Sequence, residues 1–317
     1  MASLNAASYS GPAVAIVGPT ACGKTRRAVE VAGMLGGEII SADSRQVYRG
    51  MDLGTGKDLE DYGDIPYHII DICEAGQKYN LHQYLQEFHK AYDAVRHRGR
   101  VPVVCGGTGM YVENALRGVV LPEVPENPQL RMELSAYTLD ELAEILRGYK
   151  ALHNITDIDT KARAIRAIEI QEYYRQHPEE AKETTYQGAR RLHCTVIGLD
   201  IPRYARRARI SARLRQRLDE GMIEEVRKLL DSGIAAEALI YYGLEYKYVT
   251  LYAIGRLRYE EMYAQLETAI HQFAKRQMTW FRGMVKRGTP IHWLPYDMPT
   301  QDFLGEVRRL MAEETAE

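Results

Sequence analysis

The residues best suited to chemistry lie near the start of the chain. The run Gly18-Pro19-Thr20-Ala21-Cys22-Gly23-Lys24-Thr25 matches GxxxxGK[ST], with an apolar run before it and a helical pattern after it. Its glycines let backbone N–H groups turn toward a phosphate chain, Lys24 adds a positive charge, and the Thr25 hydroxyl is placed to hold Mg²⁺. The motif predicts a polyphosphate ligand but not a reaction, because kinases, NTPases and diphosphate-using transferases can all use such a cradle.

Two further polar residues follow apolar runs that have the pattern of strands. Asp43 comes just after Glu38–Ser41, and Thr108 lies in a glycine turn after Val101–Val104. The carboxyl ends of parallel strands share one edge of a sheet, so both residues are expected near the phosphate loop. A carboxylate there can accept a proton or hold a metal, although an aspartate that caps a turn fits the local sequence equally well.

Basic residues gather on two helical segments in the second half of the chain. One long helix is predicted by an apolar stripe of Ile210, Leu214, Leu218, Met222 and Val226, beside a basic stripe of Arg206, Arg209, Arg213 and Arg217. A second helix, Tyr259–Met284, ends in the basic and aromatic run 274–286. Trp280 and Phe281 in this run are expected to pack in the core, because large aromatic residues at helical spacing usually point inward.

Strand and helix patterns alternate over most of the chain. Strands are predicted at Ala13–Val17, Glu38–Ser41, Tyr67–Ile70, Val101–Val104 and His193–Leu199, with helices such as Lys24–Leu35 and Leu81–His97 between them. This order indicates an α/β, P-loop NTPase-like fold with a parallel sheet flanked by helices. Between residues 120 and 190 a proline-opened, charged stretch shows helices without strands. The prediction is therefore a core of residues 11–119 and 191–317, including C-terminal helices, with a small helical insertion domain at 120–190.

Composition narrows the class of protein. The 317 residues are 45% hydrophobic and 26% charged, with a net charge of −2, as in an ordinary soluble globular protein. Nucleic acid would have to bind local basic surfaces rather than a global positive field. The four cysteines are far apart and form no CxxC pair, which favours neither zinc nor disulfides. With no apolar run of about 20 residues, we expect a cytoplasmic protein with no membrane contact, and a monomer.

Taken together, these segments resemble the tRNA dimethylallyltransferase family, also called tRNA isopentenyltransferases. The matching pieces follow the family's order: GPTACGKT at 18–25, SADSRQVYRGMDLGTGK at 41–57, YHIIDI at 67–72, GGTGMY at 106–111, RAIRAIEI at 163–170 and AKRQMTWFR at 274–282. SADSRQVY and AKRQMTWFR are the specific signals, since the phosphate loop alone would not separate families. Cys22 stands where the family usually has serine, Asp58 where proline is usual, and segment 241–248 where many members read IGYKE, which marks a divergent member.

The resemblance implies a reaction. A dimethylallyl group would pass from dimethylallyl diphosphate to the N6 amine of adenosine 37, next to the tRNA anticodon, with release of diphosphate and with Mg²⁺ as cofactor. Asp43 would be the general base, Thr108 would assist at the reacting centre, and Arg209 would meet the diphosphate. The diphosphate would be bound by Gly18, Thr20, Ala21, Cys22, Gly23, Lys24, Thr25 and Arg213, with Thr25 holding the metal.

The same resemblance implies that the anticodon stem-loop is a partner. Contacts to tRNA would come from Asp43, Ser44, Arg45, Gln46, Thr108, Arg131, Arg163, Arg166, Lys275, Arg276 and Gln277. Outside the matched motifs, a basic residue taken singly is more often part of a solvated helix face.

Other functions remain open on the sequence. A prenyltransferase of the same fold could act on free adenine nucleotides, although a mononucleotide would not need the insertion and the basic helices. An ATP-dependent small-molecule kinase is a second alternative, but no lid-type arginine motif can be placed. A non-catalytic RNA-binding protein with a relic phosphate loop is a third, against which stand the intact Lys24, Thr25, Asp43 and Thr108.

Overall fold

The computed structural model of the chain describes residues 9–149, 156–183 and 191–316. The chain divides into two compact units, residues 1–118 with 191–317 and residues 119–190. In the described part, no helix combines the length and apolar character needed to cross a membrane.

A six-stranded sheet, in which all paired strands run parallel, forms the centre of the larger unit, in the order β3-β2-β4-β1-β5-β6. The strands are β1 Ala13–Val17, β2 Glu38–Ser41, β3 Tyr67–His68, β4 Pro102–Gly106, β5 Cys194–Asp200 and β6 His292–Pro295. The inner strands β1 and β4 are buried along their whole length, as expected of strands covered on both faces. The predicted parallel α/β sheet is confirmed. Strand β3 is shorter than predicted because Ile69 takes a left-handed conformation with φ 64°.

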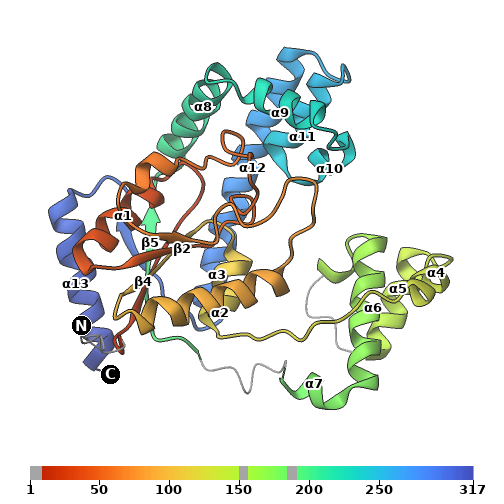
Figure 1. Cartoon of the computed structure of the whole chain (residues 1–317), viewed down its shortest axis with the longest axis horizontal. Helices are drawn as coiled ribbons and strands as arrows, with labels where there is room; N and C mark the ends of the chain where they lie inside the picture. Colours follow the sequence, from red (N-terminus) through yellow and green to blue (C-terminus); the bar gives the residue numbers. More distant parts are fainter. Residues whose placement is uncertain (1–8, 150–155, 184–190, 317) are drawn as a thin grey trace, which may run out of the picture. The chain divides into compact units, whose positions relative to one another are not determined.

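Helices cover both faces of this sheet (Figure 1). Helices α1 Lys24–Leu35 and α13 Thr300–Ala316 pack together on one side, where Phe303 and Val307 join the core beneath the strands. On the other side, α2 Leu81–His97 packs on β2 and β4, and α3 Gly109–Leu116 packs beside it. Helix α2 begins at a capping box, in which the side chains of Asn80 and Gln83 each accept a hydrogen bond from the other's backbone N–H.

A cluster of helices follows β5 in the same unit. It contains α8 Arg203–Asp219, α9 Met222–Asp231, α10 Ala236–Tyr241, α11 Leu244–Ala253 and the long α12 Tyr259–Lys286. The single helix predicted through residues 210–226 is wrong, because Gly221 breaks it with φ 103° and α9 begins at Met222. The apolar stripe misleads here because it continues across the break: Leu218 of α8 is buried, and so are Met222 and Val226 of α9.

The smaller unit has its own hydrophobic core. Its helices are α4 Pro128–Leu134, α5 Leu139–Tyr149, α6 Lys161–Gln176 and α7 Pro178–Glu183. Leu134, Leu142 and Ile168 are central to that core. Buried Glu169 accepts a bidentate pair of hydrogen bonds from Arg131, at 2.8 and 2.8 Å, and also pairs with Arg166. This charge network ties α4 to α6.

The break between α8 and α9 gives a testable prediction about stability. Gly221→Ala should lower the free energy of unfolding by about 1–2 kcal/mol, because an L-residue is strained in the left-handed region. The matched control is Gly305→Ala, within α13, where an added Cβ would meet no atom within 4 Å. That change should instead raise stability by about 0.5–1 kcal/mol, since alanine favours a helix interior. Urea unfolding of both variants measures the difference, and shifts of the same sign would contradict the strain expected at Gly221.

Candidate active site

The phosphate loop joins the end of β1 to the start of α1. Gly23 is the N-cap residue, with φ 89°, and Ala21 is one of the few non-glycine residues with a positive φ, 60°. These conformations turn the loop back on itself at the helix N-terminus, where backbone N–H groups and the helix dipole favour an anion. The Cys22 side chain is buried, and burial raises the pKa of its thiol. This side chain therefore belongs to the core, while its backbone remains part of the cradle.

Two side chains from distant helices hold this loop. Gln277 of α12 accepts a hydrogen bond from the Thr20 N–H at 2.8 Å and donates one to the Gly107 carbonyl at 2.9 Å. Arg209 of α8 donates from Nε to the Ala21 carbonyl at 2.8 Å. The Gln277 amide therefore joins the phosphate loop to the turn after β4. Its side chain is buried, with Gln277 only 6% exposed, so these hydrogen bonds are shielded from water.

The expected polar residues do meet at the carboxyl edge of the sheet. The Asp43 carboxylate accepts the Arg45 N–H at 2.9 Å, and the Thr108 hydroxyl accepts the Ser44 N–H at 3.0 Å. The turns after β2 and β4 lie so close that a Cβ on Gly106 would collide with the Ala42 carbonyl. The structure thus places Asp43 and Thr108 on neighbouring turns, at the same sheet edge as the phosphate loop.

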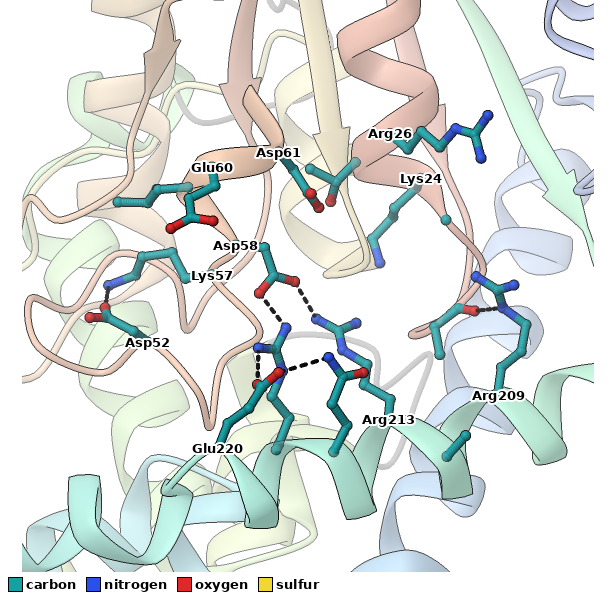
Figure 2. Close-up of a pocket in the computed structure, with 17 residues that line it drawn as sticks. Lys24, Arg26, Asp52, Lys57, Asp58, Glu60, Asp61, Arg209, Arg213 and Glu220 are labelled. Atoms are coloured by element: carbon teal, nitrogen blue, oxygen red, sulfur yellow. Dashed lines mark hydrogen bonds and ion pairs between the residues drawn. The ribbon is translucent and has the colours of Figure 1, made fainter. Parts of the chain in front are cut away.

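A cleft of about 900 Å³ opens beside the phosphate loop (Figure 2). Lys24 points into it from the loop, while Arg209 and Arg213 rise into it from α8. Thr25 also lines the cleft, as does the segment from Lys57 to Asp61 on the opposite wall. The volume lies within the usual range of small-molecule sites, roughly 300–1,000 Å³.

The charges in the cleft are only partly balanced. Asp58 accepts a hydrogen bond from Arg213 at 3.3 Å and pairs with Arg217, which also reaches Glu220 at 2.8 Å. In the described part of the chain, Lys24 and Arg209 form no ion pair with a carboxylate; their bonds go to backbone carbonyls. The end of the cleft beside the loop therefore keeps uncompensated positive charge, which suits a polyphosphate.

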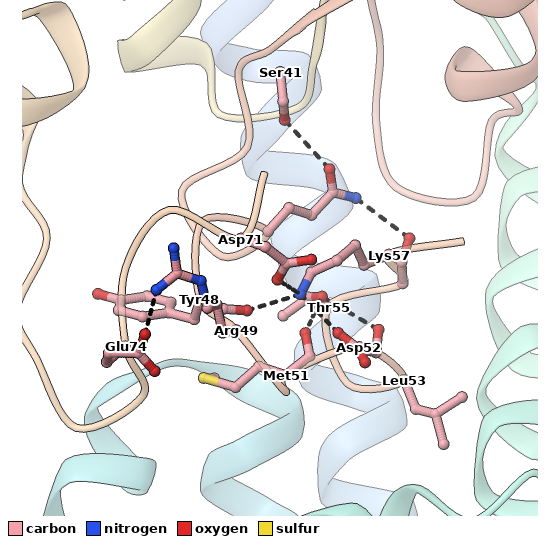
Figure 3. A network of polar contacts seen from close by, with 12 residues as sticks. Ser41, Tyr48, Arg49, Met51, Asp52, Leu53, Thr55, Lys57, Asp71 and Glu74 are labelled. Atoms are coloured by element: carbon pink, nitrogen blue, oxygen red, sulfur yellow. Dashed lines mark hydrogen bonds and ion pairs between the residues drawn. The ribbon is translucent and has the colours of Figure 1, made fainter. Parts of the chain in front are cut away.

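The segment that walls the cleft is fixed from beneath by Lys57 (Figure 3). Its fully buried ammonium donates to the Tyr48 carbonyl and to an Asp52 carboxylate oxygen, each at 2.7 Å, and also to Asp71. On the other side of this segment, Glu225 of α9 accepts the N–H groups of residues 52–54 at 2.8–3.1 Å. Sequence reasoning missed both anchors, since no local pattern links α9 to residues 52–54.

A third missed residue is Glu245, in the 241–248 segment to which the sequence assigns no role. It lines a cavity of about 60 Å³ together with Thr20, Ala21 and Arg213. Burial raises the pKa of the Glu245 carboxyl to about 7, against the opposing effect of Arg213. The position of this carboxyl beside the phosphate loop could not be recognised from the sequence, because it depends on how α11 packs.

The residues expected to touch RNA differ in how far the protein already uses their side chains. The Gln46 amide is used internally, accepting from Ser41 and donating to the Gly56 carbonyl, both at 3.3 Å. Arg45 remains partly exposed beside Asp43, and Lys275 and Arg276 are exposed on α12. In the smaller unit, Arg131 and Arg166 share Glu169, and Arg163 pairs with Asp159.

The prediction for the aromatic pair is half right. Phe281 is fully buried, but Trp280 is 40% exposed and lies against Gly109, the residue after Thr108. Helical spacing could not distinguish Trp280 from Phe281, because the boundary between the buried and the exposed face of α12 runs between these two neighbours.

Comparisons with known proteins agree with this arrangement. A family model described as IPP transferase matches residues 46–284, and one described as isopentenyl transferase matches residues 12–62. A tRNA dimethylallyltransferase 2 of Bacteroides fragilis is 56% identical over 304 residues, covering 95% of this chain and 98% of that protein. A tRNA dimethylallyltransferase 1 of Porphyromonas gingivalis is 57% identical over 301 residues, covering 94% and 98%.

Solved structures support the same relationship. The full-length tRNA isopentenylpyrophosphate transferase of Bacillus halodurans is 30% identical, with a TM-score of 0.71 over 97% of this chain and 99% of that chain. A eukaryotic dimethylallyltransferase acting on tRNA, 20% identical with a TM-score of 0.76, shares the fold. The resemblance found in the sequence motifs is thereby confirmed: this chain belongs to the tRNA dimethylallyltransferase family.

Proposed function

We propose that this enzyme transfers the dimethylallyl group of dimethylallyl diphosphate to the N6 amine of adenosine 37, next to the tRNA anticodon, and releases diphosphate. The observation that carries the proposal is the meeting of two kinds of group at one sheet edge. Lys24, at the end of the phosphate loop, lies next to Gly107 in the turn that bears Thr108, and the Thr108 hydroxyl accepts a hydrogen bond from the turn that bears Asp43. Asp43 and Thr108 are not part of the loop and are not among the residues that line the cleft. Relatives that match nearly the whole chain are named tRNA dimethylallyltransferases, which supports dimethylallyl transfer to tRNA.

Asp43 acts on the acceptor in this mechanism. An exocyclic adenine amine is a weak nucleophile, because its lone pair is delocalised into the ring. As the N6 lone pair forms a bond to C1 of the donor, the C1–O bond breaks with its electrons and the N6 proton passes to the Asp43 carboxylate. Thr108, whose hydroxyl accepts a hydrogen bond from the neighbouring turn, orients the amine. The proton then leaves to water, which restores the base.

The phosphate loop acts on the leaving group. Negative charge grows on the diphosphate as the C1–O bond breaks, and Lys24, Arg209 and the loop N–H groups stabilise it where it appears. Arg213 contributes when it exchanges its contact with Asp58 for the phosphate. Each such contact is worth roughly 10²–10³ in rate.

Mg²⁺ suits the residues present. Among the described residues no group of three or more His, Cys, Asp or Glu is arranged to hold a metal. Mg²⁺ often needs only one or two protein oxygens, with water and substrate phosphates as its other ligands. The Thr25 hydroxyl, next to Lys24 in the cleft, would hold it. A bound cation there would neutralise part of the charge on the diphosphate.

RNA is the better acceptor on physical grounds. A base in a single-stranded loop can leave its stack at low cost and enter a protein site. Lys275, Arg276 and Trp280 of α12 are exposed and lie outside the cleft lining, where they offer cations and an aromatic face to a larger acceptor.

The proposal is tested by incubating the purified protein and Mg²⁺ with labelled dimethylallyl diphosphate, offering unmodified tRNA and free AMP in parallel. Label in tRNA alone is the expected result. Label in AMP would instead select the nucleotide prenyltransferase. Label in neither, together with ATP-dependent phosphorylation of a small molecule, would overturn prenyl transfer altogether.

The role of Asp43 predicts a specific kinetic defect. Asp43→Asn keeps the shape of the side chain but removes the base, so kcat should fall by about 10²–10⁴ while the KM for the donor changes little. Asp64→Asn is the matched control, because it removes the same charge from an exposed position outside the cleft lining and should leave kcat within about twofold. A kcat near the wild-type value for Asp43→Asn would show that another group takes the proton.

The role of Lys24 predicts a different pattern. Lys24→Ala removes the cation that meets the diphosphate, so kcat/KM for the donor should fall by about 10²–10³. Lys90→Ala, which removes an exposed lysine of α2, should have no effect. Donor titrations at saturating tRNA measure both values. Equal behaviour of the two variants would place the diphosphate elsewhere.

A further inference from the structure

A second basic hollow lies between α8 and α12, apart from the residues of the cleft described above. It has a volume of about 420 Å³. Its lining comprises Arg203, Arg206 and Arg207 of α8 with Thr268, His271, Gln272 and Lys275 of α12. Four of these seven side chains are cationic and none is a carboxylate. In a chain with a net charge of −2, this is a local concentration of positive charge.

The cations of this pocket lack compensation within the protein. Across the described ranges, the side chains of Arg203, Arg206, Arg207 and Lys275 make no hydrogen bond or ion pair. Several arginines elsewhere in the larger unit are paired with a carboxylate, as Arg98 is with Glu38 at 2.6 Å. Holding like charges together without a partner costs free energy, and a bound anion would recover it.

Two further observations suit an anionic ligand at this pocket. Burial, together with Arg203 and Arg282, lowers the pKa of Arg206, as expected when cations crowd one another. In addition, the Nδ1 atom of His271 is buried without a hydrogen-bond partner. Buried polar atoms are normally satisfied, so this unpaired nitrogen shows that the polar groups between α8 and α12 are not fully satisfied within the protein.

The pocket is connected to the reaction centre through the two helices that form it. On α8, Arg203 lies six residues before Arg209, which is about 9 Å along the helix axis. On α12, Lys275 lies two residues before Gln277, the bridge to the phosphate loop. An RNA whose reactive base meets Asp43 and Thr108 would have its neighbouring backbone within reach of this pocket, because Trp280 of the same helix α12 lies against Gly109, the residue after Thr108.

We infer that the α8–α12 pocket is a phosphate-binding subsite that holds the backbone of the RNA substrate beside the base being modified; this inference rests on the proposed function. RNA fits better than an acidic protein because aromatic side chains are exposed around the cations. Tyr204 of α8 is 79% exposed, and Phe273 and Trp280 of α12 are 36% and 40% exposed. Cations combined with stacking aromatics characterise sites for single-stranded nucleic acid.

The test compares two triple variants that change net charge equally. Arg203→Ala/Arg206→Ala/Arg207→Ala removes the cations from the α8 side of the pocket, and Arg227→Ala/Arg256→Ala/Arg308→Ala removes three exposed arginines elsewhere. Binding of an anticodon stem-loop RNA is followed by fluorescence anisotropy at several salt concentrations, without donor. Steady-state kinetics are measured on the same proteins, and thermal unfolding checks that each variant folds.

For the pocket variant we expect RNA affinity to fall by at least about tenfold. The slope of log K against log [salt] should shrink by about 2, since each phosphate that no longer pairs with a cation reduces it by about 0.7. The KM for RNA should rise, while the KM for dimethylallyl diphosphate and kcat stay unchanged. The control variant should keep the wild-type slope.

Unchanged RNA affinity and salt slope in the pocket variant would overturn the inference, even if the wild type prenylates tRNA normally. A decrease equal to that of the control would also overturn it, because it would reflect net charge alone. Failure of the wild type to prenylate any RNA would instead count against the proposed function, while the anisotropy measurement would still decide whether the pocket binds RNA phosphates.

Discussion

The site depends on one buried amide. Gln277 joins the Thr20 N–H of the phosphate loop to the carbonyl of Gly107, next to Thr108. These partners lie 257 and 170 residues from it, so the donor cradle and the turn that bears Thr108 keep their spacing only if α12 crosses behind both. The rest of the C-terminal cluster follows from this requirement. Helix α8 must pack on α12, and that contact brings Arg209 onto the loop and Arg213 into the cleft.

Polar contacts also hold the opposite wall of the cleft, some from residues near in the sequence and some from α9. Lys57 is buried beneath the wall, and Glu225 of α9 accepts three backbone N–H groups from its outer turn. The wall then presents Asp58 to Arg213 and Arg217. Asp58, at a position where proline is usual in the family, gives Arg213 and Arg217 a counter-charge within the protein. Hydrogen bonds to buried and distant groups thus hold the base of the cleft, while the charged side chains at its rim pair with one another.

Much of this arrangement is predictable from local sequence, because local rules produce it. The phosphate loop, the strands around it and the positions of Asp43 and Thr108 at a common edge follow from strand, turn and helix patterns over a few residues each. The long helix through residues 210–226 could not be corrected in the same way, since the apolar stripe continues across Gly221. Glu225 was missed because the N–H groups that it accepts, at residues 52–54, are 171–173 residues away in the sequence. Lys57 was missed for another reason: its partners are near in sequence, but the loop that gathers them around its ammonium has no strand or helix pattern. The bridging role of Gln277 was also invisible, although its motif is specific, since a motif does not say which way an amide points.

If the sheet edge places one carboxylate against one adenine amine of a structured RNA, the product must carry its new group at a single atom. Mass spectrometry of nuclease fragments would locate that group, after unmodified tRNA is incubated with the enzyme, Mg²⁺ and dimethylallyl diphosphate. We expect one added dimethylallyl group, on N6 of adenosine 37 and absent from other adenosines. A prenyl group on another nucleotide or another atom, or scattered over several adenosines, would rule out this placement of Asp43.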